Sequence, residues 1–211
     1  MTKRNGSLSR KNIRQIAVLG ILSAITALMV FTPLGMIPVT STISATTCLL
    51  PCLVGLLVEG PLVGGILGLV FGLLSMLRGF IAPISVMDPM FQNPLVSVLP
   101  RVLVPLFAWL IYKLAAGKST NSKEKYIGYT LAAIAGSIVN TFVVLLMVAL
   151  FNGALIMADY SGAVQPYLAK NAYTILLWLV AVPNGIPEAI LSALAVPPIV
   201  VAVSSVKKRF N

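Results

Sequence analysis

The sequence contains no histidine and only two cysteines, Cys48 and Cys52. Histidine is the commonest metal ligand and the usual base near neutral pH, so its absence removes the simplest metal sites and any serine–histidine catalytic pair. The two thiols lie four residues apart in an apolar segment, which predicts packing residues. We therefore expect no metal site and no cofactor.

Charged residues are also scarce. They make up 9% of the 211 residues, whereas a soluble domain carries roughly 25%. Hydrophobic residues make up 58%, and long apolar runs recur along the whole chain. These features exclude a soluble domain and predict a protein that crosses the lipid bilayer several times. The net charge of +10 would suggest nucleic acid in a soluble protein, but in a membrane protein we expect no nucleic-acid partner.

Several apolar segments match the length of a membrane-spanning helix, about 17 to 25 residues. Those of ordinary length are Ile13–Phe31, Leu95–Leu114 and Ile127–Phe151. Two others are too long for one ordinary span. Ile43–Leu77 is interrupted by Glu59-Gly60-Pro61, and Ala172–Val206 contains prolines at 183, 187, 197 and 198.

Basic residues resolve both ambiguities because they mark cytoplasmic segments. They cluster before and at Arg14, in the stretch 113–125, and at 207–209. If all these clusters are cytoplasmic, an even number of helices separates each from the next. Ile43–Leu77 must then be two short helices, and Ala172–Val206 one long helix. The sequence thus predicts an all-α integral membrane fold with six transmembrane helices and both termini in the cytoplasm.

We expect a single six-helix membrane domain over residues 1–211, with a basic cytoplasmic segment at 1–12 and a basic cytoplasmic tail at 204–211. The longer connections then lie outside, at Thr32–Thr42, Gly79–Pro94 and Asn152–Asn171. Long semi-polar connections often fold over a binding site, although ordinary external linkers are the alternative.

No set of residues suggests catalysis. The stretch 116-AGKST-120 resembles the end of a phosphate-binding loop, but Tyr112 stands where that motif needs glycine, and a membrane helix precedes it where the motif needs a strand. No paired carboxylates share a predicted helix face. We expect a chain that is not an enzyme and has no ATPase of its own.

Polar residues within predicted spans are functional candidates because polar groups are costly at that depth. Arg101 and Glu188 both fall in the outer half of their helices. Arg101 either binds the carboxylate or phosphate of a small solute through its planar guanidinium, or it forms a structural ion pair with Glu188 or snorkels to the outer interface. Asn140 and Asn184 either contact the substrate or hydrogen-bond between helices.

Two further features concern the surface of the bundle. Gly20 and Ala24 lie one turn apart on the first helix, a pattern that allows close approach by another helix of this chain or by a partner subunit. Arg78 closes the third predicted helix and is expected to anchor it at the outer membrane interface.

These features together resemble the substrate-binding S-components of energy-coupling factor (ECF) vitamin transporters. The resemblance covers nearly the whole chain. It is most specific in 55-GLLVEGPLVGGILGLVFGLLSML-77 and 91-FQNPLVSVLPR-101, which are most similar to pantothenate-type S-components. It implies the high-affinity vitamin-binding subunit of an ATP-driven importer in the bacterial cell membrane, with pantothenate as the expected substrate.

The resemblance also implies roles for individual residues. A substrate site near the outer face would be formed by Arg101, Asn140, Asn184, Glu188, Gln92 and Asn93. Arg101 would hold the carboxylate. Gly20 and Ala24 correspond to an Ala-x-x-x-Ala motif that docks on a membrane-embedded coupling subunit, which assembles with two cytoplasmic ATPases; glycine in place of the first alanine keeps that groove small.

Other functions stay open at this point. One is a proton-coupled secondary carrier of a small anionic solute, with Glu188 as the titrating group. Another is an S-component for a different vitamin, such as folate or cobalamin. A third is a membrane assembly subunit in which Arg101 and Glu188 form only a structural pair. The absence of an obvious inverted repeat favours the S-component over the carrier.

Overall fold

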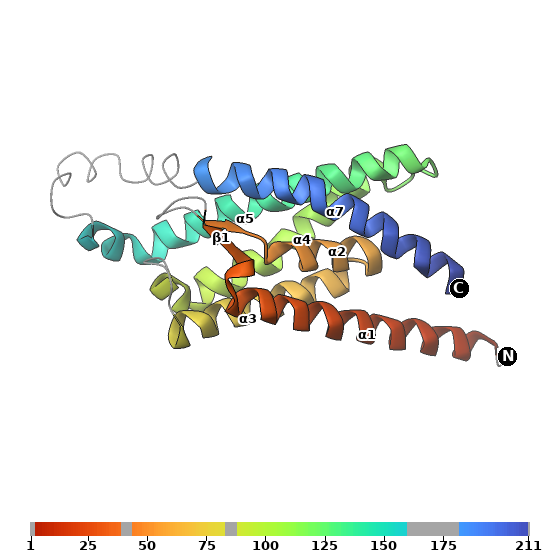
Figure 1. Cartoon of the computed structure of the whole chain (residues 1–211), viewed down its shortest axis with the longest axis horizontal. Coiled ribbons are helices and arrows are strands. Elements are labelled where there is room, and N and C mark those ends of the chain that lie inside the picture. The colour runs from red at the N-terminus through yellow and green to blue at the C-terminus, as the bar shows by residue number, and fades with distance from the viewer. Residues whose placement is uncertain (1–2, 39–43, 83–87, 160–181, 211) are drawn as a thin grey trace.

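The computed structural model of the chain describes residues 3–38, 44–82, 88–159 and 182–210. Within these residues the chain forms an elongated bundle whose helices run along its long axis (Figure 1). Both termini lie at the same end of the bundle, which we call the terminal end. A short β-hairpin lies toward the opposite end, which we call the hairpin end.

The described helices are α1 (Lys3–Phe31), α2 (Leu49–Glu59), α3 (Pro61–Ile81), α4 (Pro94–Ala116), α5 (Ser122–Asp159) and α7 (Val182–Phe210). The shorter elements are the 3-10 helices η1 (Pro33–Gly35) and η2 (Asp88–Gln92) and the strands β1 (Met36–Pro38) and β2 (Ser44–Thr46). The strands pair antiparallel, with Met36 opposite Thr46.

Five of the described helices are long and apolar enough to cross a membrane: α1, α3, α4, α5 and α7. The sixth, α2, has 11 residues and so rises roughly 16 Å, about half the thickness of a hydrocarbon core. The chain is therefore an all-helical integral membrane protein, as predicted. One of its six described helices is too short to span the bilayer alone.

The two ambiguous segments follow the prediction where the structure describes them. The segment Ile43–Leu77 contains α2 and α3, which turn at Gly60 with a φ of 103°, in the left-handed region that favours glycine. From Val182 onward α7 is one continuous helix through its internal prolines, and residues 172–181 lie outside the described residues. The hairpin of β1 and β2 was not predicted, because strands of three residues carry no readable alternation.

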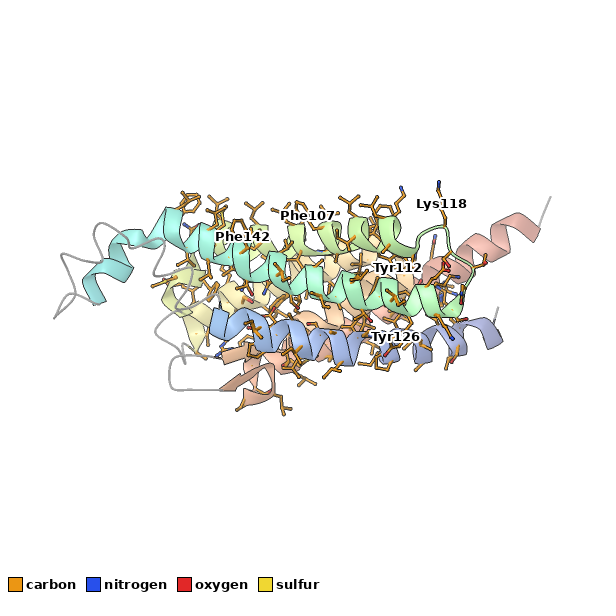
Figure 2. All side chains as sticks on the ribbon, turned by 90° about the horizontal axis from the view of Figure 1, so that it is seen from above. Phe107, Tyr112, Lys118, Tyr126 and Phe142 are labelled. Carbon is orange, nitrogen blue, oxygen red and sulfur yellow. The ribbon has the colours of Figure 1, made fainter. Side chains whose placement is uncertain are left out.

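The basic clusters share one end of the bundle. The N-terminus, the C-terminus and the connection between α4 and α5 all lie at the terminal end (Figure 1), and Lys118 of that connection lies there as well (Figure 2). The clusters therefore share one end of the bundle, as an even number of helices between them requires, and the cytoplasmic location of that end stays a prediction.

The shortest helix, α2, is at the centre of the bundle. It contacts all five other described helices, and its leucines Leu49, Leu53 and Leu56 are almost completely buried. A helix that is apolar on every side is expected in such a position. Cys48 and Cys52 are buried here too, and each thiol donates to a backbone carbonyl at 3.4 Å, so their interpretation as packing residues is confirmed.

Close contact between α3 and α4 depends on a missing side chain. A Cβ atom at Gly68 would overlap the backbone carbonyl oxygen of Arg101. That carbonyl has no helical donor, because Pro105, four residues later, lacks an N–H. Glycine at 68 therefore lets the backbone of α3 lie directly against the irregular part of α4.

We predict that Gly68→Ala lowers the free energy of unfolding by about 1 to 3 kcal/mol, because the added methyl group forces α3 and α4 apart. The control is Gly65→Ala in the same helix, where a Cβ meets nothing within 4 Å. That change is expected to raise stability by about 0.5 to 1 kcal/mol, since alanine favours the helix. Equal effects of the two changes on thermal unfolding in detergent would contradict this account of the α3–α4 contact.

Candidate functional site

Three residues with polar side chains, each on a different helix, form the centre of the candidate site. Arg101 of α4, Asn140 of α5 and Glu188 of α7 are 6%, 5% and 3% exposed. Buried charges and amides need partners, because each unsatisfied polar group in an apolar interior is destabilising. The contacts of each residue therefore show which of its hydrogen-bonding groups the protein itself satisfies.

Glu188 and Asn140 are in direct contact. The side-chain amide of Asn140 donates to Oε1 of Glu188 at 3.0 Å. Beside this pair, Ser137 donates to the hydroxyl of Ser192 at 2.7 Å, so further polar contacts join α5 to α7. The amide oxygen of Asn140 is buried and has no hydrogen-bond partner among the described residues.

Arg101 is held by a backbone carbonyl that receives no hydrogen bond within the helix. In an α-helix the N–H of residue 100 would donate to the carbonyl of Val96, but Pro100 has no N–H. The guanidinium of Arg101 takes that place, with Nη1 donating to the Val96 oxygen at 3.0 Å. The proline before the arginine thus creates the acceptor that anchors its side chain.

Two aromatic rings enclose the guanidinium. Its central carbon lies 5.4 Å from the ring centroid of Phe71 on α3 and 4.8 Å from that of Phe91 on η2. Both distances are within the range of cation–π attraction, which is strongest where water is excluded. The Nε atom of Arg101 is buried and has no hydrogen-bond partner among the described residues.

The structure does not show Arg101 and Glu188 as a direct structural pair. Within the described part of the chain, no ion pair of 4.0 Å or less joins them, although the two charges interact electrostatically over a longer distance. The carboxylate of Glu188 is bound by Asn140 instead. The interpretation that Arg101 exists only to pair with Glu188 is therefore not supported by this geometry.

The unsatisfied atoms define what the site can bind. The Nε–H of Arg101 needs an acceptor and the amide oxygen of Asn140 needs a donor. A small anion that also carries a hydroxyl or an amide N–H offers both. Binding such a molecule would remove two buried unsatisfied groups, each worth about 1 to 3 kcal/mol.

The other predicted site residues lie nearer the hairpin end of the bundle. Gln92 is exposed and donates to the carbonyl of Gly79 at 2.9 Å. Asn93 caps the start of α4, with its side chain accepting from the N–H of Leu95 at 3.0 Å. Both therefore have structural partners, and their role at the rim of a site stays a prediction. Asn184 lies in the first turn of α7, and its side chain is outside the described residues.

Arg78 was expected to anchor α3 at the membrane interface, and this prediction was wrong. It is only 4% exposed, and it donates to the carbonyl of Val30 at 3.1 Å. That carbonyl is one of the last four of α1, which receive no hydrogen bond from an N–H of their own helix. Arg78 therefore ties the end of α1 to α3 at the hairpin end.

The small residues of α1 face away from the bundle. Gly20 and Ala24 are exposed, and a Cβ at Gly20 would meet nothing within 4 Å. Large apolar neighbours on this helix, Ile21 and Leu28, are 63% and 66% exposed. Packing against another described helix of this chain is therefore excluded for this face, which leaves lipid or a partner subunit as its neighbour.

The aromatic contacts of Arg101 were not predicted from the sequence. Phe71 and Phe91 both lie within the stretches that carried the family resemblance, but neither has a polar group that would mark it as part of a site. The contact of Arg101 with the Val96 carbonyl did have a signal in the sequence. It is the position of Pro100, because a proline in a helix leaves the carbonyl four residues earlier without a donor.

Comparison with known families identifies the chain's relatives. The model of the ECF transporter, substrate-specific component, matches residues 14–200. The chain belongs to this family. The S-component is thus a transport subunit, and it is a multi-pass protein of the bacterial cell membrane.

One curated relative is similar to this S-component over most of its length. The pantothenic acid transporter PanT of Lactococcus lactis subsp. cremoris (strain MG1363) is 27% identical over 157 residues, which cover 68% of this chain and 76% of the relative. The family match and this relative agree with the resemblance recognised in the sequence.

We predict that Phe91→Leu lowers the stability of the S-component by about 1 kcal/mol, because leucine fills similar space but offers no π face to the guanidinium. The matched control is Phe107→Leu on the outward face of α4 (Figure 2), where the ring is 46% exposed. There we expect a change within about 0.5 kcal/mol. Thermal unfolding in detergent measures both, and an equal effect would show that the ring contact with Arg101 is not stabilising.

Proposed function

We propose that this S-component is the high-affinity pantothenate-binding subunit of an ATP-driven ECF importer. Family membership over residues 14–200 supports the transporter class. The similarity to a pantothenic acid transporter supports the vitamin. The observation that carries the proposal is the buried guanidinium of Arg101, which is oriented by protein contacts on several sides and has no hydrogen-bond partner for Nε among the described residues.

We further propose that six helices place both termini in the cytoplasm, with residues 1–211 as one domain. The location of all the basic clusters at the terminal end supports this orientation, since cytoplasmic segments are enriched in lysine and arginine. The hairpin end then faces outward. Arg101 lies about two turns from the start of α4 at that end, so the site lies in the outer half of the bundle.

The chemistry of pantothenate matches the polar groups around the site. It carries a carboxylate, an amide and two hydroxyls. Arg101 binds the carboxylate, and Asn140 accepts from a hydroxyl or from the amide N–H. Glu188, fixed by Asn140 at 3.0 Å, orients that amide or accepts a hydroxyl itself. Gln92, Asn93 and Asn184 complete the site at its outer rim.

Transport requires partners, because no ATPase motif is present in this sequence. The exposed face of α1 at Gly20 and Ala24 docks on the membrane-embedded coupling subunit. Two cytoplasmic ATPases bound to that subunit hydrolyse ATP. Small residues suit this role because they let the two helix backbones approach closely.

We predict that Arg101→Ala weakens pantothenate binding by about 30-fold or more, which corresponds to about 2 kcal/mol or more for a desolvated charge that loses its partner. Calorimetric titration of the purified S-component measures the dissociation constant. The matched control is Lys113→Ala, which removes an equal charge from an exposed position of the same helix. The dissociation constant of Lys113→Ala for pantothenate is expected to match that of the wild type.

The outcomes separate the parts of the proposal. Folded wild-type protein that fails to bind pantothenate would contradict the choice of vitamin, and titration with folate and cobalamin would follow. Wild-type binding that persists in Arg101→Ala would contradict the role of this arginine and would move the carboxylate partner elsewhere. Uptake that needs a proton gradient and no ATPase would support the carrier instead.

A further inference from the structure

A charge cluster around a second buried side chain lies at the terminal end of the bundle and involves none of the site residues. Its centre is Glu59, the last residue of α2, whose side chain is 2% exposed. Oε1 of Glu59 lies 3.2 Å from Nε of Arg14 and 3.3 Å from Nζ of Lys207. Oε2 accepts from Nη2 of Arg14 at 3.2 Å. One carboxylate therefore joins α1, α2 and α7.

The same helices also complete the end of α2. The last carbonyls of a helix have no donors within it. Here Nζ of Lys207 donates to the carbonyl of Val58 at 2.8 Å, and the side chain of Gln15 donates to that of Glu59 at 3.4 Å. Residues of α1 and α7 thus take the place of a further turn of α2, so the end of α2 is joined to α1 at Arg14 and Gln15 and to the last turns of α7.

The position of Glu59 is unfavourable for α2 itself. A negative charge at the C-terminus of a helix is repelled by the helix dipole, and burial of a carboxylate is costly unless it is paired. Neither the repulsion by the helix dipole nor the cost of burial is offset by a residue of α2. Among the described residues, the carboxylate is paired with cations on α1 and α7, which points to a role in connecting those helices.

These two helices carry different parts of the transport machinery. α1 presents Gly20 and Ala24 on its outward face, and Gly20 lies six residues, or roughly 9 Å, beyond Arg14. α7 carries Glu188 of the candidate site. The direction of α1 at the terminal end is therefore set by the same carboxylate that holds the end of α7.

We propose that Glu59 is a positioning residue for transport, which fixes the docking helix α1 against α7. This inference rests on the proposed function, because it assumes that α1 docks on the coupling subunit. Through Arg14 the carboxylate sets the orientation of the docking face. Through Lys207 it links that face to the helix of the substrate site, so a displacement of α1 on the coupling subunit is transmitted to α7.

The test compares Glu59→Gln, which keeps the shape of the side chain and removes its charge, with Glu124→Gln. Glu124 is an exposed acidic residue in the first turn of α5, so both variants lose the same charge. Each full-length chain is titrated with pantothenate in detergent, tested for coelution with its coupling subunit and ATPases, and assayed for uptake after reconstitution of the complex in liposomes.

We expect Glu59→Gln to bind pantothenate within about twofold of the wild type, because the site lies in the other half of the bundle. Its coelution with the coupling subunit, or its maximal uptake rate at unchanged KM, is expected to fall about tenfold or more, as for loss of a buried charge partner. Glu124→Gln is expected to match the wild type in every measurement. If Glu59 only stabilised the fold, its substitution would lower pantothenate binding and docking together.

Other results would overturn the inference. Unchanged coelution and uptake in Glu59→Gln would show that the cluster does not position α1. Parallel loss of pantothenate binding and docking in a folded variant would show a general structural role. If Glu59→Gln does not fold, Arg14→Gln and Lys207→Gln remove one connection each, and normal docking and uptake in both would equally contradict the proposal. Failure of the proposed vitamin would be seen separately, as absent binding in the wild type, while coelution still reports on Glu59.

Discussion

A guanidinium buried among apolar helices must be satisfied by its surroundings, and Arg101 shows how this chain does so. Pro100 leaves the carbonyl of Val96 without a helical donor, and Arg101 donates to it at 3.0 Å. Phe71 and Phe91 attract the positive charge through their rings. The Nε–H of Arg101 has no hydrogen-bond partner among the described residues, and it is the part that a ligand can take.

The rest of the bundle depends on keeping this arrangement in place. Gly68 lets α3 lie against α4 at the carbonyl of Arg101, and this contact brings the helix that carries Phe71 beside the guanidinium. Asn140 holds the carboxylate of Glu188 across α5 and α7, so that the negative charge is bound without neutralising Arg101 by direct contact. At the terminal end, Glu59 joins α1 and α7 to the central helix.

Sequence patterns predicted the features that depend on position along the chain. Apolar length and basic clusters gave the helices and the turn at Gly60, and polar residues at membrane depth gave Arg101, Asn140 and Glu188. Features that depend on rotation about a helix axis were missed, because most residues of a span are apolar and can face either lipid or protein. The burial of Arg78 and the partners of Glu59 therefore became visible only when the helices were placed beside one another.

The central claim is that Arg101 binds the carboxylate of the substrate, and a thermodynamic cycle tests it most directly. Wild-type protein and Arg101→Ala are each titrated with pantothenate and with its alcohol analogue, in which a hydroxymethyl group replaces the carboxylate. We predict that the wild type prefers pantothenate by about 30-fold or more and that the variant loses this preference, a coupling of about 2 kcal/mol or more. An equal preference in both proteins would contradict the claim, because the carboxylate would then be recognised by another group.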